Sequence, residues 1–253
     1  MKPRICDFLP VPDLLSAENI LCIQPHPDDM EIGAGATLAR LSRSGKQVTA
    51  LTITDGSAGT YQPSDKPDEI AGIRKAETEK SANLLGVKKL IWLDYADGGN
   101  LPYEKIRADI TRTIRRLKPD AVMTCDPWLP YEAHSDHNRT GLAAAEACLL
   151  SGMPQFCPDD LKDGIMPHGV KMIALYYTAY PNTWIDASNT WKIKLAAIDC
   201  HVSQFSGEKG EKLKEYLTTR AEEQAEKGKY RLVEALKILT ISHLHIFEEA
   251  WQC

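Results

Sequence analysis

The sequence predicts an α/β fold, a mostly parallel sheet flanked by helices on both faces. Short apolar, β-branched runs alternate with longer segments that repeat apolar residues at helical spacing. The segments between the runs are far longer than antiparallel hairpins need, so right-handed crossovers between parallel strands are expected. With 253 residues, the chain is long enough to bury a full core.

The apolar runs predict five strands in the first 178 residues of the chain. They cover residues 19–24, 47–54, 89–93, 120–124 and 171–178. Helices are predicted between and after them, over residues 32–44, 69–85, 103–117, 138–150 and 188–201. Gly45 and Gly86 follow two of these segments in the position where glycine commonly ends a helix, and Pro119 follows a third.

We expect a single domain over residues 1–253, because no stretch has the composition of a linker. Its core spans about residues 19–204. Residues 205–253 are predicted to form a C-terminal extension with a charged helix over 207–229 and a final strand over 232–241. The charges of that helix are interpreted as a solvated face.

Composition excludes several classes of partner. The net charge of −5, the pI near 5.8 and the absence of a Lys/Arg cluster argue against nucleic acid. No apolar run reaches the length of a membrane span. Three of the seven cysteines (Cys22, Cys125 and Cys148) lie in apolar segments and none is spaced C-x-x-C, which indicates buried thiols and a cytoplasmic protein.

Two clusters of histidine and carboxylate carry the strongest functional signal. His-Pro-Asp-Asp occupies residues 26–29, directly after the first predicted strand, and His-Ser-Asp-His occupies residues 134–137, after the fourth. Loops that follow parallel strands gather at one edge of the sheet, where ligands bind. Asp55, Asp94 and Asp97 follow the second and third strands, so we expect all of these polar loops to share a site.

This set of residue types suits a catalytic zinc ion with an open coordination position. His26, one aspartate and one downstream histidine would bind the metal. The other aspartate would act as general base and the other histidine would stabilise an oxyanion. Spacing alone does not decide which of Asp28 and Asp29 is the ligand and which is the base. It also does not decide between His134 and His137.

Structural interpretations compete with these roles. Asp29 stands where an N-cap is expected, and Ser135 or Asp136 could cap the helix that follows. Arg74 and Glu77 are one helical turn apart and could form a surface pair. Two clusters on the same edge of the sheet nevertheless favour a shared site over two coincidences.

The sequence resembles the PIG-L/LmbE-like family of zinc-dependent N-acetylglucosaminyl deacetylases. The family hallmark, [Pro/Ala]-His-Pro-Asp-Asp, reads Pro-His-Pro-Asp-Asp at residues 25–29. Its second element, H-x-D-H, matches residues 134–137, with Ser135 where proline is frequent. The similarity runs from about residue 20 to residue 204 and also covers residues 54–56, 74–77, 85–87, 97–98 and 194–204.

The resemblance implies a role for each residue of the two clusters. It makes His26, Asp29 and His137 the metal ligands. It makes Asp28 the general base and His134 the group that stabilises the tetrahedral intermediate.

Three further residues receive supporting roles from the same resemblance. Asp136 would orient His134 or a metal-bound histidine. Arg74 resembles a substrate-binding arginine of the family. Asp55 lies in the matched segment 54–56, and the resemblance implies that it contacts the substrate or supports the metal ligands. The family fold is Rossmann-like, in agreement with the strand pattern.

The activity implied is zinc-dependent hydrolysis of an N-acetyl group from an N-acetylglucosamine-containing sugar or conjugate, which releases acetate. Another divalent ion would also suit these ligands. Such deacetylases are often homo-oligomers, so the resemblance implies one here. Two alternatives stay open: a metallohydrolase of another bond, such as a thiol-conjugate amide or a phosphoester, and a non-catalytic ligand-binding protein of the same fold.

Overall fold

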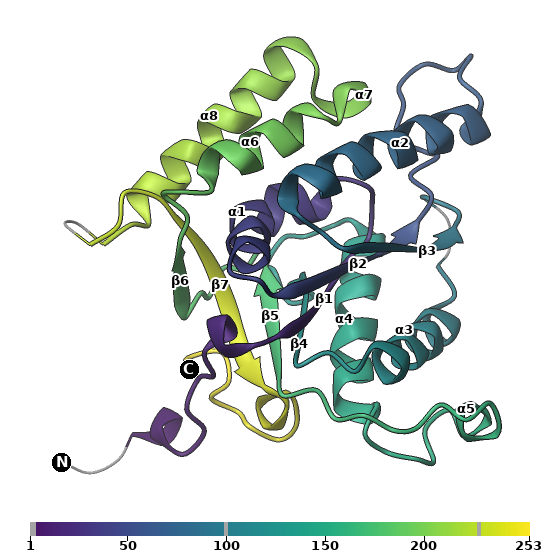
Figure 1. The fold of residues 1–253 in the computed structure, drawn as a ribbon, viewed down its shortest axis with the longest axis vertical. Coiled ribbons are helices and arrows are strands. Elements are labelled where there is room, and N and C mark those ends of the chain that lie inside the picture. The colour runs from purple at the N-terminus through teal and green to yellow at the C-terminus, as the bar shows by residue number, and fades with distance from the viewer. Residues whose placement is uncertain (1–3, 99–100, 227–228) are drawn as a thin grey trace. The chain divides into compact units, whose positions relative to one another are not determined.

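A computed structural model describes residues 4–98, 101–226 and 229–253 (Figure 1). Its seven strands form one sheet in the order β3-β2-β1-β4-β5-β7-β6, with helices around it. The strands are β1 (Asn19–Gln24), β2 (Gln47–Thr54), β3 (Lys89–Tyr95), β4 (Ala121–Cys125), β5 (Met172–Tyr176), β6 (Thr183–Asp186) and β7 (Val233–Thr240). The predicted α/β fold is therefore confirmed.

The helices that were predicted are present, with ends that differ by a few residues. The α-helices of the described residues are α1 (Asp29–Arg43), α2 (Pro67–Leu85), α3 (Tyr103–Leu117), α4 (Ser135–Leu150), α5 (Asp159–Lys162), α6 (Trp191–Asp199), α7 (Val202–Phe205) and α8 (Gly207–Glu223). The four-residue elements β6, α5 and α7 were not predicted, because segments that short carry no measurable periodicity. The charged helix ends at Glu223, and residues 227–228 of its predicted range lie outside the described residues.

Strand pairing is mostly parallel. β2 pairs with β3 and β4 pairs with β5 in parallel, as the long helical connections require. β7 pairs with β5 in antiparallel register, with Leu175 opposite Lys237. The C-terminal strand therefore reverses direction in an otherwise parallel sheet, an arrangement that is common in α/β folds.

The chain is divided into two compact units. Unit 1 comprises Met1–Leu21, Pro102–Thr183 and Leu236–Cys253, and unit 2 comprises Cys22–Leu101 and Trp184–Ala235. Strands β1 and β7 each contribute residues to both units. The single domain over residues 1–253 stays a prediction.

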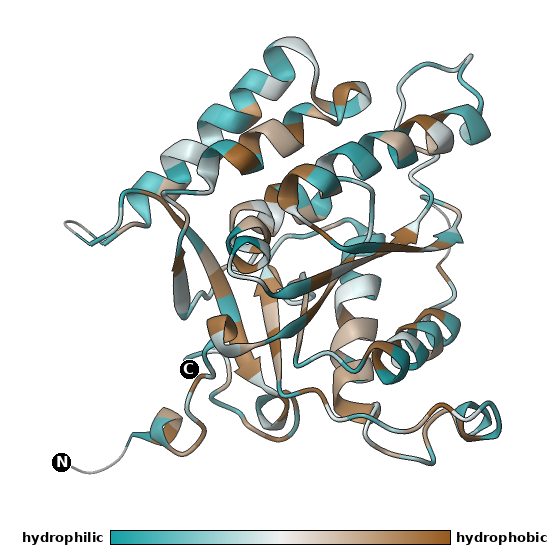
Figure 2. Ribbon diagram, in the orientation of Figure 1, coloured by the Kyte–Doolittle hydropathy of each residue, from teal (hydrophilic) through white to brown (hydrophobic). Residues whose placement is uncertain are grey.

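In unit 2, α1, α6 and α8 enclose an apolar cluster. Its buried members include Ala36 of α1, Trp191 and Ile198 of α6, and Leu217 of α8. Most of the other residues of α8 are hydrophilic, as the ribbon colours of Figure 2 show. The interpretation of its charges as a solvated face is consistent with this packing.

A buried ion pair joins α6 to β7 inside unit 2. The Lys194 ammonium lies 2.5 Å from the Glu234 carboxylate and also donates to the Ile32 carbonyl at 2.7 Å. The other carboxylate oxygen of Glu234 accepts from the Thr37 N–H of α1 at 2.6 Å. Both charged side chains are buried, so each charge is stabilised by the opposite charge of its partner.

Lys194→Met is expected to lower the free energy of unfolding by about 3–5 kcal/mol, because it leaves the Glu234 carboxylate buried without its counter-ion. Denaturant unfolding followed by circular dichroism measures the change. The matched control is Lys212→Met, which removes an exposed lysine from α8 and should leave stability unchanged. Equal effects of the two substitutions would contradict the prediction.

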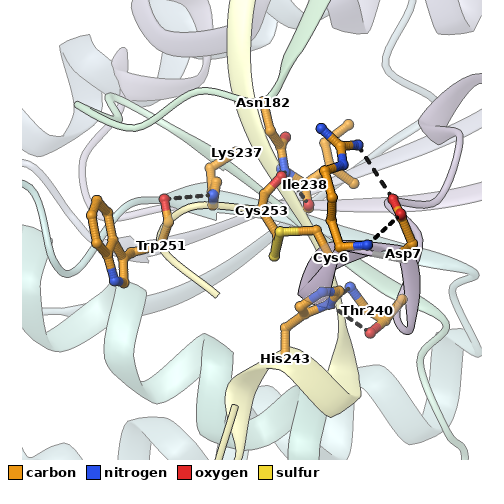
Figure 3. The surroundings of a disulfide bond; sticks show 10 residues. Cys6, Asp7, Asn182, Lys237, Ile238, Thr240, His243, Trp251 and Cys253 are labelled. Carbon is orange, nitrogen blue, oxygen red and sulfur yellow. Dashed lines mark hydrogen bonds and ion pairs between the residues drawn. A yellow bond between two sulfur atoms is a disulfide. The ribbon is translucent and has the colours of Figure 1, made fainter. Parts of the chain in front are cut away.

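Cysteine chemistry is only partly as expected. Cys22, Cys125 and Cys148 are buried thiols outside any disulfide, which confirms the interpretation of those three. Cys6 and Cys253, in contrast, form a disulfide within unit 1, so the general expectation of reduced thiols was wrong (Figure 3). Among the described residues, no helix combines the length and apolar composition needed to cross a membrane.

Candidate active site

The backbone at Asp28 is strained, just where α1 begins. Its φ of +144° lies in a region that residues other than glycine rarely adopt. Asp28 is the N-cap residue, yet its side chain makes no capping hydrogen bond. Strain of this kind persists where the surroundings enforce it and is concentrated at functional sites.

His26 lies between two carboxylates of unit 2. Its Nδ1 is 3.2 Å from Oδ2 of Asp29, which also accepts from the His26 backbone N–H at 2.9 Å. Its Nε2 is 3.2 Å from Oδ1 of Asp97. The Asp29 carboxylate therefore contacts His26, and Asp29 is not the N-cap that its position in the sequence suggested.

Arg74 of α2 is buried and organises the loop before α1. Its guanidinium donates to the carbonyls of Gly56 at 2.9 Å and Pro27 at 3.0 Å, and to the Asp28 carboxylate at 3.0 Å. It is therefore not the surface partner of Glu77 that spacing allowed. The Glu77 carboxylate instead accepts from the Ser203 N–H and hydroxyl, at 2.8 and 2.7 Å.

Burial raises the pKa of Asp28 to about 7, and the neighbouring charge of Asp29 adds to the increase. The charges of Arg74, His201 and His26 act in the opposite direction. A carboxylate with a pKa near the working pH is well suited to accept and return a proton.

Asp55 and Asp97 tie the loops after β2 and β3 together. Oδ1 of Asp55 accepts from the backbone N–H groups of Ser57 and Asp97, at 2.9 and 3.1 Å. Burial alone would raise the pKa of Asp97, but the hydrogen bond and charge of His26, with the charge of Arg74, bring it below its usual value. Asp97 is therefore an ionised partner for His26.

In unit 1, the second cluster begins α4. His134 is the N-cap residue, and its Nδ1 accepts from the Asp136 N–H at 3.3 Å, so the expectation that Ser135 or Asp136 caps this helix was wrong. The His134 ring stacks on that of His137, with centroids 4.9 Å apart. His134 is exposed, His137 is half-buried and the Asp136 side chain is buried.

Glu132 supplies a carboxylate to the second cluster. Its Oε2 lies 3.3 Å from Nδ1 of His137, and its Oε1 accepts from the His134 backbone N–H at 2.7 Å. Sequence reasoning did not single out Glu132, because a glutamate outside the motif carries no signal of its own. Asp97 was noticed only as a loop residue, since its contact with His26 depends on tertiary structure.

A second buried group lies near Asp28 in unit 2. Nε2 of His201 is 3.4 Å from the carboxylate of Glu31, and both side chains are fully buried. Burial alone would lower the pKa of His201, but the charge and hydrogen bond of Glu31, with the charges of Asp28 and Glu77, raise it. The resemblance covered His201 without giving it a role, and no spacing links it to residues 26–29.

These surroundings fit a divalent cation. Two ligand atoms at about 2.1 Å from one tetrahedral ion are about 3.4 Å apart, close to the 3.2 Å that separates Nδ1 of His26 from Asp29. The Asp97 carboxylate lies next to one ring nitrogen of His26, and the Glu132 carboxylate lies next to one ring nitrogen of His137. Metal-binding histidines are typically oriented by such a carboxylate.

Residues 21–148, about half of the chain, match the protein family PIG-L, described as GlcNAc-PI de-N-acetylase. A diacetylchitobiose deacetylase from Thermococcus kodakarensis is 40% identical over 230 residues, which cover 90% of this chain and 86% of that protein. The chain belongs to the PIG-L family. The resemblance drawn from the two motifs is thereby confirmed.

Other PIG-L relatives extend the comparison. The structure of N,N'-diacetylchitobiose deacetylase from Pyrococcus horikoshii, complexed with an inhibitor, superposes with a TM-score of 0.87 at 44% identity, covering 91% of this chain and 87% of that one. A 1D-myo-inositol 2-acetamido-2-deoxy-alpha-D-glucopyranoside deacetylase from Catenulispora acidiphila is 29% identical over 66% of this chain and 58% of that protein. The PIG-L match therefore extends well beyond the motifs.

Proposed function

We propose that this PIG-L protein is a metal-dependent N-deacetylase that removes the acetyl group from an N-acetylglucosamine-containing sugar and releases acetate. The observation that carries the proposal is the strained, buried Asp28 beside the His26–Asp29 pair. The names of the diacetylchitobiose deacetylases, which match about nine tenths of the chain, support the substrate class.

His26, Asp29 and His137 are the proposed ligands of a divalent cation. Strand β1, which leads into residues 26–29, neighbours β4, which leads into residues 134–137. Ligands of α/β sheets bind where such loops emerge from the strands. Nitrogen and carboxylate donors suit Zn²⁺, the ion we propose, although other divalent ions accept the same set.

A bound cation supplies a Lewis acid for the amide carbonyl and lowers the pKa of water. Asp28 removes a proton from the attacking water as general base and then delivers it to the leaving nitrogen. Arg74 fixes the Asp28 carboxylate through its 3.0 Å hydrogen bond, so that the base does not have to be reoriented during the reaction.

His134 is proposed to donate a hydrogen bond to the oxyanion that develops on the substrate carbonyl. Its exposed ring is anchored by the Asp136 N–H and by stacking on His137. Asp136 is proposed to help orient these histidines, beside Glu132. For Arg74 and Asp55, the described contacts support positioning of the loops, and direct contact with the substrate stays a prediction.

Acetate release tests the proposed function. The purified protein is expected to release acetate from N-acetylglucosamine, diacetylchitobiose or related acetamido sugars, and to lose this activity when a chelator removes its metal. Activity should return on addition of Zn²⁺. Release of phosphate from phosphoesters instead of acetate would identify another metallohydrolase. A protein that binds no metal and releases neither product would be a non-catalytic binding protein.

Deacetylation is expected to decline as the pH falls, because only the ionised form of Asp28 accepts a proton. In the protein without metal, the pKa of Asp28 is about 7. A bound cation favours the ionised form, so the acid limb of kcat/KM in the loaded enzyme should have its midpoint below 7. A pH–rate profile measures it, and a rate that rises on acidification through this range would contradict the role of Asp28.

Cytoplasmic location and homo-oligomeric assembly stay predictions. The buried thiols of Cys22, Cys125 and Cys148 are consistent with a reducing compartment. The Cys6–Cys253 disulfide argues against one, because such bonds are uncommon in reducing compartments. Size-exclusion chromatography with light scattering measures the oligomeric state.

A further inference from the structure

The proposed chemistry gives no role to residues 201–204, His-Val-Ser-Gln, in unit 2. They form the N-cap and most of the short helix α7, which lies beside α2, the helix that carries Arg74 (Figure 1). Three of their four side chains contact residues of other elements. The segment is therefore more than a connection between α6 and α8.

Gln204 is joined to Arg74 by a chain of hydrogen bonds. Its side-chain amide donates to the Gly59 carbonyl at 2.8 Å and to the Ser203 hydroxyl at 3.1 Å. The Gly59 N–H donates to the Gly56 carbonyl at 3.2 Å. That same carbonyl accepts from Nη1 of Arg74 at 2.9 Å. The loop after β2 thus links the two side chains.

This loop packs directly against the guanidinium of Arg74. A Cβ atom on Gly56, whose φ is +70°, would lie 2.9 Å from Nη1. A Cβ atom on Gly59 would overlap the same nitrogen and would lie 3.2 Å from Nε2 of Gln204. The Gly59 backbone therefore fills the space between Arg74 and Gln204, and a shift of Gly59 would change the space available to the guanidinium.

The guanidinium in turn depends on its two terminal nitrogens for its orientation. Nη1 is bound to Gly56, and Nη2 donates to the Pro27 carbonyl and the Asp28 carboxylate, both at 3.0 Å. Within the part of the chain that the structure describes, the buried Nε of Arg74 has no hydrogen-bond partner. The position of the Asp28 carboxylate is therefore coupled to that of the loop after β2.

Two further contacts fix α7 to the helices around Asp28. The Ser203 N–H and hydroxyl donate to the carboxylate of Glu77, one helical turn after Arg74 on α2. The His201 ring lies 3.4 Å from the carboxylate of Glu31 in the first turn of α1. The helix that carries the glutamine is thus attached both to the helix of the arginine and to the helix that Asp28 precedes.

From these contacts, we infer that Gln204 is a positioning residue for the deacetylation, which acts through Gly59 and Arg74 to hold the Asp28 carboxylate in place. This inference rests on the proposed function. A general base has to stay within hydrogen-bond reach of the proton that it removes, and a misplacement of 1 Å can cost about 100-fold in rate. The hydrogen bond to the Gly59 carbonyl limits such movement.

Gln204→Met tests the inference, because methionine has a similar length and flexibility but no amide donor. This variant should lower kcat for acetate release about tenfold, less than the cost of a full 1 Å misplacement. KM and zinc content should be unchanged, because the base acts in the chemical step. The matched control is Gln224→Met, which replaces a half-buried glutamine at the end of α8 and should alter none of these values.

A double-mutant cycle separates positioning of the base from a general effect on structure. In an Asp28→Asn protein, Gln204→Met should cause no further loss of kcat, because the group that it positions is already absent. An equal loss with and without Asp28 would overturn the inference, and so would loss of zinc from Gln204→Met. An unchanged kcat in Gln204→Met, beside an active wild-type protein, would overturn the inference alone.

Gly59→Ala is a second variant that leaves the glutamine intact. Its methyl group would force the Arg74 guanidinium to move, so kcat should again fall while zinc is retained. Gly72→Ala is its control, because a Cβ atom there meets nothing within 4 Å, and it should match the wild-type protein. Equal kcat values for the two alanine variants would contradict the inference. A wild-type protein that releases no acetate would overturn the proposed function, and the inference with it.

Discussion

Asp28→Asn is expected to retain the divalent cation and to reduce kcat for deacetylation by about 10³-fold, within the range that general bases contribute. The amide has the size of the carboxylate and keeps an oxygen that accepts from Arg74, so the loop geometry should survive. It cannot accept a proton from water, and the chemical step is therefore lost. Acetate release and metal content are measured on the same preparation.

A matched control for this substitution is Asp199→Asn, which changes an exposed aspartate of α6 that pairs with Lys214. It should alter neither turnover nor metal content. If Asp28→Asn loses its metal together with its activity, Asp28 is a ligand, and its role has been exchanged with that of Asp29.

His137→Ala is expected to lose both metal and activity. Loss of a residue that only orients a metal ligand weakens metal binding by up to about 100-fold. Loss of one of the three ligands themselves should therefore weaken metal binding by more than about 100-fold. Deacetylation should become undetectable at metal concentrations that saturate the wild-type protein. Metal titration followed by a colorimetric chelator, together with acetate release, measures the two losses.

His245→Ala serves as the control for this second substitution, because His245 is an exposed histidine of the same unit outside both clusters. It should bind metal and turn over like the wild-type protein. A His137→Ala protein that holds its ion at wild-type affinity would exclude His137 from the ligand set.

The fold was largely predictable because local signals and tertiary packing agree. Residues 19–24 and 47–54 form strands with the predicted ends, and residues 103–117 form a helix with the predicted ends. The antiparallel direction of β7 could not be predicted, because it depends on pairing between Leu175 and Lys237, which are far apart in the chain. The four-residue β6 was missed, since its single buried residue gives no pattern.

The candidate site was predictable to the extent that its residues lie in motifs. Residues 26–29 and 134–137 were identified from residue type and spacing, and the family match supports that identification. Asp97 was expected at this edge of the sheet, but its contact with His26 was not predicted, and Glu132 was not singled out at all, because an isolated carboxylate is ordinary until a histidine is found beside it. The burial of Arg74 and its contacts with Pro27 and Gly56 likewise arise from tertiary structure.

The disulfide was missed for a related reason. Cys6 and Cys253 are separated by 247 residues, and the odd number of cysteines favoured reduced thiols. Cys6 and Cys253 come together only when unit 1 folds, so their pairing cannot be predicted from the spacing of cysteines in the sequence.

Anomalous X-ray diffraction at the zinc edge, on crystals grown with Zn²⁺, shows whether the two motifs bind one ion. We expect one strong peak bonded to His26, Asp29 and His137, with Asp28 near it but not coordinated. A peak coordinated by residues of only one cluster, or none near either, would show that the two motifs do not share an ion and would contradict the proposed reaction.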